Sequence, residues 1–248
     1  MNHLQKPTSG SYKSKVYCAF SPDYVKFCDT FEKAKGRASA VFSLLNAYGL
    51  LKELRLFSPK KANKTQLCQF HSQDYIDALQ QASSSRTDNT GEELLEEYGF
   101  GYDCPLKPGL FDYVQLVAGA TLDAATALTM GSCNIAINWG GGWHHAKRNE
   151  ASGFCYVNDC VLAILKMREQ FQKVLYLDLD IHHGDGVQEA FWTSKKVFTV
   201  SFHNFEPGYF PGSGSSAEIG ASNGKNYCVN VPLREGCTDG QFTQVFDR

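Results

Sequence analysis

Apolar and polar positions follow one another along the chain in two rhythms, one typical of helices and the other of strands. Apolar residues that recur every three or four positions predict helices, and short apolar runs between turn residues predict strands. The predicted helices cover 34–51, 73–82, 111–130, 159–171 and 186–192, and the predicted strands cover 16–20, 133–139, 174–179, 197–202 and 227–231. From residue 133 onward strand and helix alternate. This predicts an α/β fold with a single parallel β-sheet flanked by helices on both faces.

The two ends of the folded region differ from this rhythm. Residues 1–15 are polar and contain Pro, Ser and Gly, so we expect a flexible N-terminal tail and a single domain over 16–248. Near residue 239 a last helix is predicted to begin.

In that last helix Asp239 is a good cap, and Phe242, Val245 and Phe246 would form the buried stripe. Arg248 follows without a helix stop signal. We therefore interpret the chain as a fragment of a longer domain, with a natural end in a frayed helix as the alternative.

Composition narrows the class of protein. The 248 residues are 43% hydrophobic, and 24 Lys and Arg against 26 Asp and Glu give a net charge of −2, so no basic surface for nucleic acid is implied. The nine cysteines include no Cys-x-x-Cys pair, which favours a reducing compartment, the nucleus or the cytoplasm. The sequence contains neither an apolar signal core nor a run of about 18 apolar residues, so no membrane association is expected.

Carboxylates and imidazoles gather directly after the predicted strand 174–179. Side chains at alternate positions of an extended segment project to one side, so Asp178, Asp180 and His182 are predicted to converge. One carboxylate oxygen and one imidazole nitrogen are two of the three protein ligands of a catalytic zinc. A metal site explains this clustering better than a single helix cap does.

A second loop with chemical content follows the strand 133–139. Three glycines at 140–142 precede the pair His144 and His145. A neutral imidazole can take a proton from metal-bound water, and a carboxylate behind it fixes its tautomer. A pair of histidines alone is more often structural. Its place beside the metal loop, at the same edge of the sheet, favours a catalytic pair.

Three longer motifs carry a resemblance to a known family. They are GGWHHAK over 141–147, EASGFCY over 150–156 and DLDIHHGDG over 178–186, and shorter matches are YDCP at 102–105, RAS at 37–39 and FPG at 210–212. Over residues 16–248 the chain resembles the class I histone deacetylases. The resemblance implies the arginase/deacetylase fold, with a narrow tunnel that leads to zinc, and it implies that the chain is the N-terminal two-thirds of the catalytic domain.

The resemblance also implies roles for individual residues. Asp180 and His182 would bind zinc (Zn2+), while the third zinc ligand and a tyrosine that stabilises the oxyanion would lie beyond Arg248. We therefore expect the chain alone to have little activity. His145 would act as general base and then general acid, and His144 would stabilise charge.

The remaining implied roles concern orientation, substrate and monovalent cations. Asp185 would orient His145, and Asp178 would orient His144. Substrate would be held by Asp103, Gly153, Phe154 and Phe210. Monovalent cation sites, with potassium (K+) as the expected ion, are implied at Asp178, Asp180, His182, Ser201 and Phe202 and at Phe191, Ser194, Val197 and Tyr227.

The expected function is therefore a zinc-dependent hydrolase that removes acetyl groups from lysine in histones and other proteins, in the nucleus and the cytoplasm. Neither nucleic acid nor a membrane is an expected partner. One alternative is an acetylpolyamine amidohydrolase of the same fold, and a more remote one is a manganese ureohydrolase. Another is a truncated, catalytically impaired isoform that competes with a full enzyme for partners.

Overall fold

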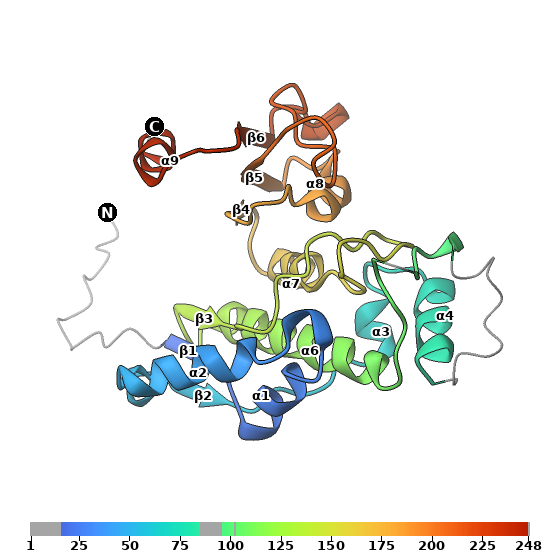
Figure 1. Ribbon diagram of the computed structural model, residues 1–248, viewed down its shortest axis with the longest axis vertical. Helices are drawn as coiled ribbons and strands as arrows, with labels where there is room; N and C mark the ends of the chain where they lie inside the picture. The colour runs from blue at the N-terminus through green and yellow to red at the C-terminus, as the bar shows by residue number, and fades with distance from the viewer. Residues whose placement is uncertain (1–15, 85–95, 102, 248) are drawn as a thin grey trace, which may run out of the picture.

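The computed structural model describes residues 16–84, 96–101 and 103–247 (Figure 1). The tail predicted at 1–15 and Tyr102 of the YDCP match lie outside the described residues. Within the described ranges, no helix is both long and apolar enough to cross a membrane.

A first sheet forms from strands in the amino-terminal half of the chain. The strand order is β2-β1-β3, and both pairings are parallel. The strands are β1 (Val16–Ala19), β2 (Arg55–Phe57) and β3 (Ile135–Ile137). The α-helices described in this half are α1 (Pro22–Cys28), α2 (Arg37–Ala47), α3 (Lys64–Leu67), α4 (Gln73–Ser84) and α6 (Leu110–Thr129). Short 3-10 turns occupy Glu32–Ala34 and Leu50–Lys52.

A second sheet forms from strands in the carboxyl-terminal half. Its order is β4-β5-β6, again parallel, with Asp178 of β4 paired with Ser201 of β5. The elements are β4 (Val174–Asp178), β5 (Val197–Asn204), β6 (Cys228–Leu233), α7 (Asp159–Arg168), α8 (Asp185–Phe191), α9 (Asp239–Phe246) and a 3-10 turn at Ser222–Gly224. Figure 1 shows α8 on one side of this sheet and α9 on the other.

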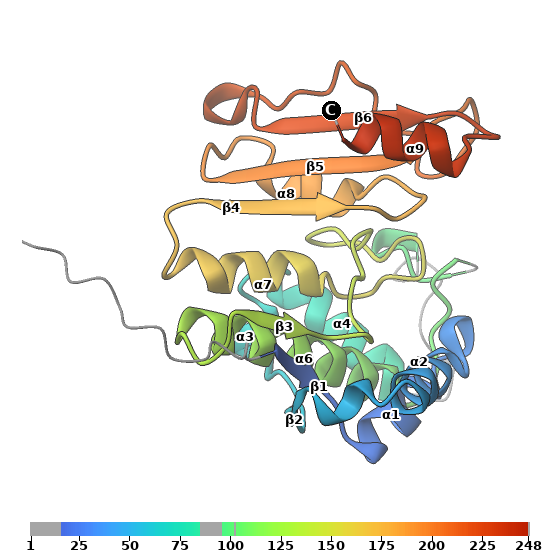
Figure 2. The same ribbon diagram turned by 90° about the vertical axis from the view of Figure 1, so that its left-hand side faces the viewer.

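The predicted α/β class and the parallel pairing are confirmed, but the described strands form two sheets and not one. Strand β3 pairs only with β1, and β4 pairs only with β5, so in the described part of the chain each has one unpaired edge. Helix α7 lies between β4 and α6 (Figure 2). Hydrophobic periodicity identifies a strand but does not say which strand it pairs with.

Three short elements were not predicted, because each is too short to show a hydrophobic period. They are α1, β2 and α3. Local caps nevertheless mark both helices: Ser21 accepts a hydrogen bond from the Tyr24 amide, and Asn63 forms a capping box with Gln66.

Helix α9 corrects two details of the prediction. Its cap is Thr238 and not Asp239, and no residue described in α9 is buried. The stripe does have a contact: the rings of Phe242 and Phe246 lie 5.8 and 5.5 Å from the ring of Phe202. The stripe therefore packs against β5 but not into a closed core.

Helix α6 is the centre of the core. Val117 and Ala118 on its buried face are 2% and 1% exposed, and α7 contributes Leu162 at 1%. Burying a valine or leucine side chain in this way contributes about 1.5–3 kcal/mol. This packing gives α7 a firm position, and the first turn of α7 adjoins the site described below.

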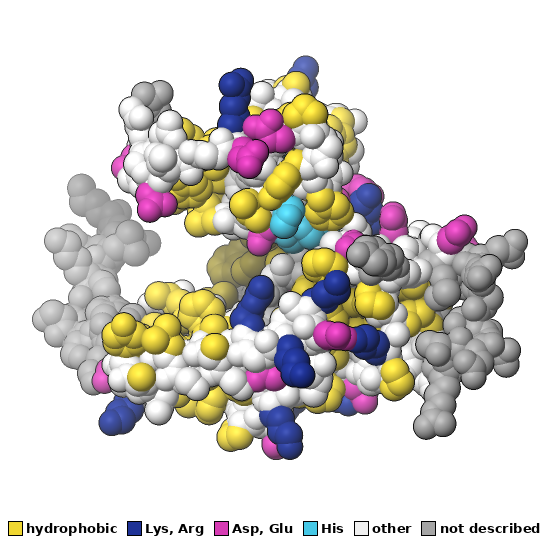
Figure 3. Space-filling model, in the orientation of Figure 1, with side chains coloured by type: hydrophobic (Ala, Val, Ile, Leu, Met, Phe, Trp, Pro, Cys, Tyr) yellow, Lys and Arg dark blue, Asp and Glu magenta, His cyan; other side chains and the backbone are white. Residues whose placement is uncertain are grey.

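Leucines are exposed at the unpaired edge of β4. Leu175 is 64% exposed and Leu177 is 44% exposed, and Figure 3 shows hydrophobic side chains around the hollow between the two halves of the molecule. An unpaired, apolar strand edge is a template for association with another chain.

We expect the chain to self-associate in a concentration-dependent manner, and Leu177→Lys to weaken that association at least about tenfold, because a charge on an edge strand disfavours strand addition. Sedimentation velocity over a range of concentrations measures the effect. Met130→Lys is the matched control, since Met130 is 75% exposed and lies at the C-cap of α6, outside strand β4. Equal weakening by both variants would contradict an edge-specific contact.

Candidate active site

Two loops bring the predicted site residues together. One follows β3 and carries His144 and His145, and the other follows β4 and carries Asp180 and His182. Both loops leave the carboxyl ends of parallel strands, where binding sites of α/β sheets occur. The rings of His145 and His182 have centroids 5.9 Å apart, so the two loops meet.

His144 is tied to Asp178 at the end of β4. Its Nδ1 lies 2.6 Å from Asp178 Oδ2, and Tyr176 donates its hydroxyl proton to the same oxygen. Burial lowers the pKa of His144, but the hydrogen bond and charge of Asp178 outweigh burial, and the net pKa is raised. Burial raises the pKa of Asp178, yet its bonds from His144 and Tyr176 leave the pKa below its usual value. The pair therefore favours a charged imidazole.

His145 has the opposite electrostatic setting. Its Nδ1 lies 2.7 Å from Asp185 Oδ1. Burial lowers the pKa of His145, the Asp185 hydrogen bond opposes that shift only in part, and the neighbouring His144 lowers the pKa further. The two rings are 4.0 Å apart between centroids. Adjacent imidazoles whose pKa values are pushed apart suit one neutral base and one charged stabiliser.

Asp180 and His182 provide two possible metal donors. Asp180 Oδ1 lies 3.2 Å from His182 Nδ1, close to the spacing of about 3.3 Å between two ligands of tetrahedral zinc with bonds near 2.0 Å. Both side chains are open to solvent, 51% and 38% exposed. The spacing of these two residues suits two of the three protein ligands of a catalytic zinc. Among the described residues, no group of three His, Cys, Asp or Glu side chains could hold a metal, so the third ligand is not among them.

The predicted convergence of three alternating side chains is wrong in one respect. Strand β4 ends at Asp178, and Asp180 and His182 follow in a bend. Asp178 is turned to His144, and its Oδ1 accepts the Asp180 amide at 3.0 Å. The alternation of an extended strand stops where the strand stops, so Asp178 lies behind the other two residues and not beside them.

Phe210 and Gly153 stand closest to His145 among the predicted substrate residues. The Phe210 ring lies 4.8 Å from the His145 ring and 5.7 Å from the His182 ring. Phe210 is 39% exposed and Phe154 is 37% exposed, so neither is buried in the core. Their predicted place along a substrate tunnel stays a prediction. Lys33 lies over the Phe154 ring at 4.4 Å, a cation–π contact.

Asp103 holds the segment that presents Phe154. Its Oδ2 accepts the amide of Gly153 at 2.7 Å, and Phe154 has a positive φ of 68°. The exposed carboxylate is therefore engaged by the protein's own backbone, which sets the position of the rim. The predicted contact of Asp103 with substrate stays a prediction.

A side chain at Gly153 would collide with the site. A Cβ there would lie 2.5 Å from His145 Cδ2 and 3.0 Å from Phe210 Cζ, and φ is +54°. We expect Gly153→Ala to displace the His145 ring and, in a chain extended to include the third zinc ligand, to lower the hydrolysis proposed below by about 10²-fold, the usual cost of misplacing a catalytic group by about 1 Å. Steady-state kinetics measures this, with Gly142→Ala, another positive-φ glycine whose Cβ would meet nothing within 4 Å, as control. Similar losses in both variants would assign the effect to backbone strain.

The residues predicted for monovalent cations fall into two groups. Asp178 and Ser201 are neighbours across β4 and β5, and Ser201 Oγ lies 2.8 Å from His203 Nδ1. The second group lies where α8 leads into β5: Phe191 O accepts the Ser194 amide at 2.9 Å, and Val197 begins β5. Phe202 follows Ser201 in β5, and Tyr227 O accepts the amide of Thr199, two residues after Val197, at 3.0 Å. The predicted cation sites stay predictions.

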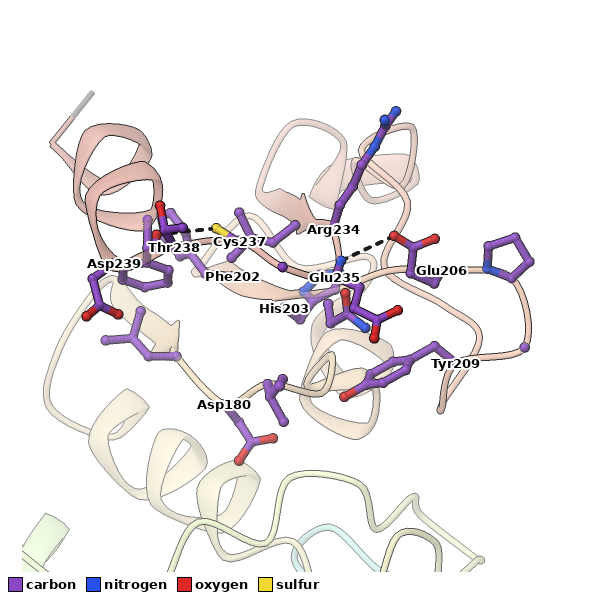
Figure 4. A pocket seen from close by; sticks show the side chains of 18 residues that line it. Asp180, Phe202, His203, Glu206, Tyr209, Arg234, Glu235, Cys237, Thr238 and Asp239 are labelled. Atoms are coloured by element: carbon purple, nitrogen blue, oxygen red, sulfur yellow. Dashed lines mark hydrogen bonds between the residues drawn. The ribbon is translucent and has the colours of Figure 1, made fainter.

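A cavity opens on the outer side of Asp180 (Figure 4). Its volume is about 690 Å³, and its walls include Tyr209 and the segment from Arg234 to Asp239. Tyr209 was not predicted; its ring stacks on His182 at 5.4 Å. The sequence offered no signal for it beyond its position next to Phe210. Asp180 lines this cavity, whereas His182 is not among its lining residues.

A buried histidine behind the site was also not predicted. His71 is 1% exposed; its Nδ1 lies 3.2 Å from Arg148 O, and its Nε2 accepts the Asn158 amide at 3.0 Å. This arrangement places the ring proton on Nδ1. Burial lowers the pKa of His71 from 6.5 to about 4, because a charged ring would be deprived of its hydration. A proton on Nε2 would also break the hydrogen bond that this nitrogen accepts from the Asn158 amide.

Because the folded chain keeps His71 neutral, the unfolded chain binds the extra proton between pH 6.5 and about 4. The stability from His71 is therefore complete above pH 6.5 and is lost as the pH falls, by about 3 kcal/mol in total. Urea unfolding at pH 7 and pH 4 should show a steeper loss in the native chain than in His71→Gln. Parallel losses in the two chains would contradict this assignment.

Comparison with known proteins places the chain in a family. A profile of the histone deacetylase domain matches residues 32–248. Histone deacetylase 8 of Xenopus tropicalis is 53% identical over 226 residues, which is 91% of this chain and 61% of the relative. For histone deacetylase 8 of Danio rerio the values are 47% over 245 residues, 98% of this chain and 64% of the relative.

Histone deacetylase 8 of Xenopus laevis is 51% identical over 191 residues, 77% of this chain and 58% of the relative. The chain thus spans about three fifths of the length of these curated relatives. The matches confirm the resemblance to class I histone deacetylases that the motifs predict. The chain therefore belongs to the histone deacetylase family.

Proposed function

We propose that this site hydrolyses the acetyl amide of acetyl-lysine in histones and other proteins, with zinc as its metal. The observation that supports the proposal most strongly is the pair His144 and His145, whose rings are in contact, whose Nδ1 atoms each face a carboxylate and whose pKa values shift in opposite directions. The family match supports the same reaction.

In this proposal Asp180 and His182 would hold the zinc together with a third donor. When bound, zinc supplies a Lewis acid that polarises the amide carbonyl and acidifies water. His145, kept neutral, would accept a proton from the attacking water at Nε2 while Asp185 holds its Nδ1 proton, and would then donate that proton to the lysine nitrogen as the C–N bond breaks. His144, kept charged by Asp178, stabilises the developing negative charge.

Phe154, Phe210 and Gly153 would line the path of the lysine methylenes, and Asp103 would hold the substrate backbone. The aromatic rings exclude water from the reacting amide, which strengthens the electrostatic contacts. Residence in the nucleus, with the cytoplasm as a second location, and potassium at the two cation groups belong to the same proposal. Nucleic acid and membranes are not among the proposed partners.

The test compares two proteins. One is the 248-residue chain, and the other, here the completed chain, is this chain followed by the part of the Xenopus tropicalis relative that comes after the aligned region. We expect the completed chain to bind one zinc and to hydrolyse an acetyl-lysine peptide faster than acetylspermidine. Preference for acetylspermidine would favour an acetylpolyamine amidohydrolase, and activity with manganese but not zinc would favour a ureohydrolase-like site.

A second candidate function is a non-catalytic, competing chain. The family match does not favour this alternative, which rests only on the sequence-based interpretation of the chain as a fragment. A folded 248-residue chain without bound zinc and without turnover would support it, whereas turnover equal to that of the completed chain would exclude it. Circular dichroism, metal analysis and the peptide assay decide between the two.

A further inference from the structure

Asn158, the cap of α7, holds the backbone on both sides of His145. Its side chain is fully buried, and its Nδ2 donates to His144 O at 3.1 Å and to Ala146 O at 2.9 Å. Both amide protons are thus used by the segment that carries the histidine pair. Without these donors the two carbonyl groups would be buried and unsatisfied at considerable cost.

The next residue, Asp159, binds the same loop at Gly142 and Trp143, just before the histidine pair. It is 1% exposed; its Oδ1 accepts the Trp143 amide at 2.8 Å and the Gly142 amide at 3.1 Å. Its Oδ2 accepts the hydroxyl of Thr121 at 2.6 Å. Two consecutive side chains therefore hold the loop, which we call the grip: Asp159 accepts the two amides before the histidine pair, and Asn158 donates to the carbonyls of the residues on either side of His145.

This grip is itself fixed from three sides. Asn158 Oδ1 accepts the Val161 amide at 3.0 Å as the cap of α7, and the Asn158 amide donates to His71 Nε2. A Cβ at Gly186, in α8, would lie 2.5 Å from His144 O and 2.6 Å from Ala146 O. The two carbonyl groups thus lie between Asn158 and the first turn of α8, which packs closely against them.

We infer that Asn158 and Asp159 are positioning residues that set the place and orientation of the His144 and His145 rings. The expected change in reaction rate rests on the proposed function. The expected change in the position of the two rings rests on the hydrogen bonds alone. Catalytic groups need a supporting shell that holds them to within about 0.5 Å of the productive geometry, and these two residues supply that shell from a core helix.

Two variants break the grip and leave the size of the side chain unchanged. Asn158→Asp keeps the cap acceptor for Val161 but turns the donor toward two carbonyl oxygens into an acceptor. Asp159→Asn weakens the acceptor for the two loop amides and is the milder change. Thr121→Val is the matched control, because it removes the hydrogen bonds that Thr121 donates to Asp159 and accepts from Asn138 but leaves both loop amides bound to Asp159 and the Asn138 side-chain amide bound to Val117 O.

The readout is the NMR signal of the hydrogen-bonded Nδ1 protons of His144 and His145 in the 248-residue chain, below the unfolding temperature. We expect both signals in the native chain and in Thr121→Val, and their shift or loss in Asn158→Asp and Asp159→Asn. In the completed chain kcat should fall about 10- to 100-fold in the latter two, with KM changed less than about threefold.

Unchanged ring signals in a folded Asp159→Asn chain would overturn the inference, as would an equal loss of signals in Thr121→Val. If Asn158→Asp does not fold, Asp159→Asn decides. If neither folds, amide exchange in the native chain decides: the Gly142 and Trp143 amides should exchange as slowly as those of α7, and fast exchange would refute the grip. If the native 248-residue chain shows both ring signals but the completed chain hydrolyses no peptide, the proposed function is refuted and the positioning role is not affected.

Discussion

Replacing His145 with alanine in the completed chain is expected to lower kcat for an acetyl-lysine peptide by about 10²- to 10⁴-fold, the usual contribution of a general base. The reason is local. His145 is the imidazole whose burial and charged neighbour favour the neutral form, and Asp185 fixes its Nδ1 proton, so Nε2 is free to accept. Steady-state kinetics at neutral pH measures the effect.

Zinc content separates this result from a general collapse of the site. His145 makes no described contact with Asp180, so the alanine variant should bind zinc as the native completed chain does. A variant with full zinc and nearly native kcat would remove His145 from the mechanism. A variant that loses zinc would instead make His145 part of the metal site.

Replacing Asp180 with asparagine is expected to weaken zinc binding by at least about 10²-fold, since loss of an outer-shell partner already costs 10- to 100-fold and a direct ligand contributes more. Asparagine has the same shape but lacks the negative charge that attracts the ion. Competition with a chelator of known affinity measures the change, and peptide hydrolysis should fall with zinc occupancy.

Asp185→Asn is the matched control for that experiment. It makes the same chemical change on a carboxylate that contacts His145 and not His182. We expect this variant to keep its zinc but to lose kcat, because the tautomer of His145 is no longer fixed. Equal loss of zinc in both variants would contradict the assignment of Asp180 as the donor.

Much of the fold was predictable because periodicity is a local property. The strands at β4, β5 and β6 and the helices α4, α6 and α7 were placed from apolar spacing to within a few residues. The division of the strands into two sheets was not predictable. Strand pairing depends on contacts between residues far apart in the chain, and β3 and β4 show the same apolar pattern whether or not a neighbour covers their edges.

The candidate site shows the same division more sharply. The spacing of Asp178, Asp180 and His182 predicted a cluster at a strand end, and the structure places them together, with Asp178 facing His144 and not the metal side. Tyr209 and His71 carried no comparable signal. Their importance comes from ring stacking and burial, which adjacent residues do not reveal.

By itself, the sequence determined the α/β class, the two loops with chemical content and the family. Tertiary structure alone decided how two adjacent, chemically identical histidines differ: one faces Asp178 and favours its charge, while the other is buried against Asp185 and favours neutrality. It also decided that Asn158, which the sequence shows only as a residue before a helix, holds their backbone. The physical reason is that pKa values and hydrogen bonds depend on distance and burial, and these are set by packing between segments far apart in the chain.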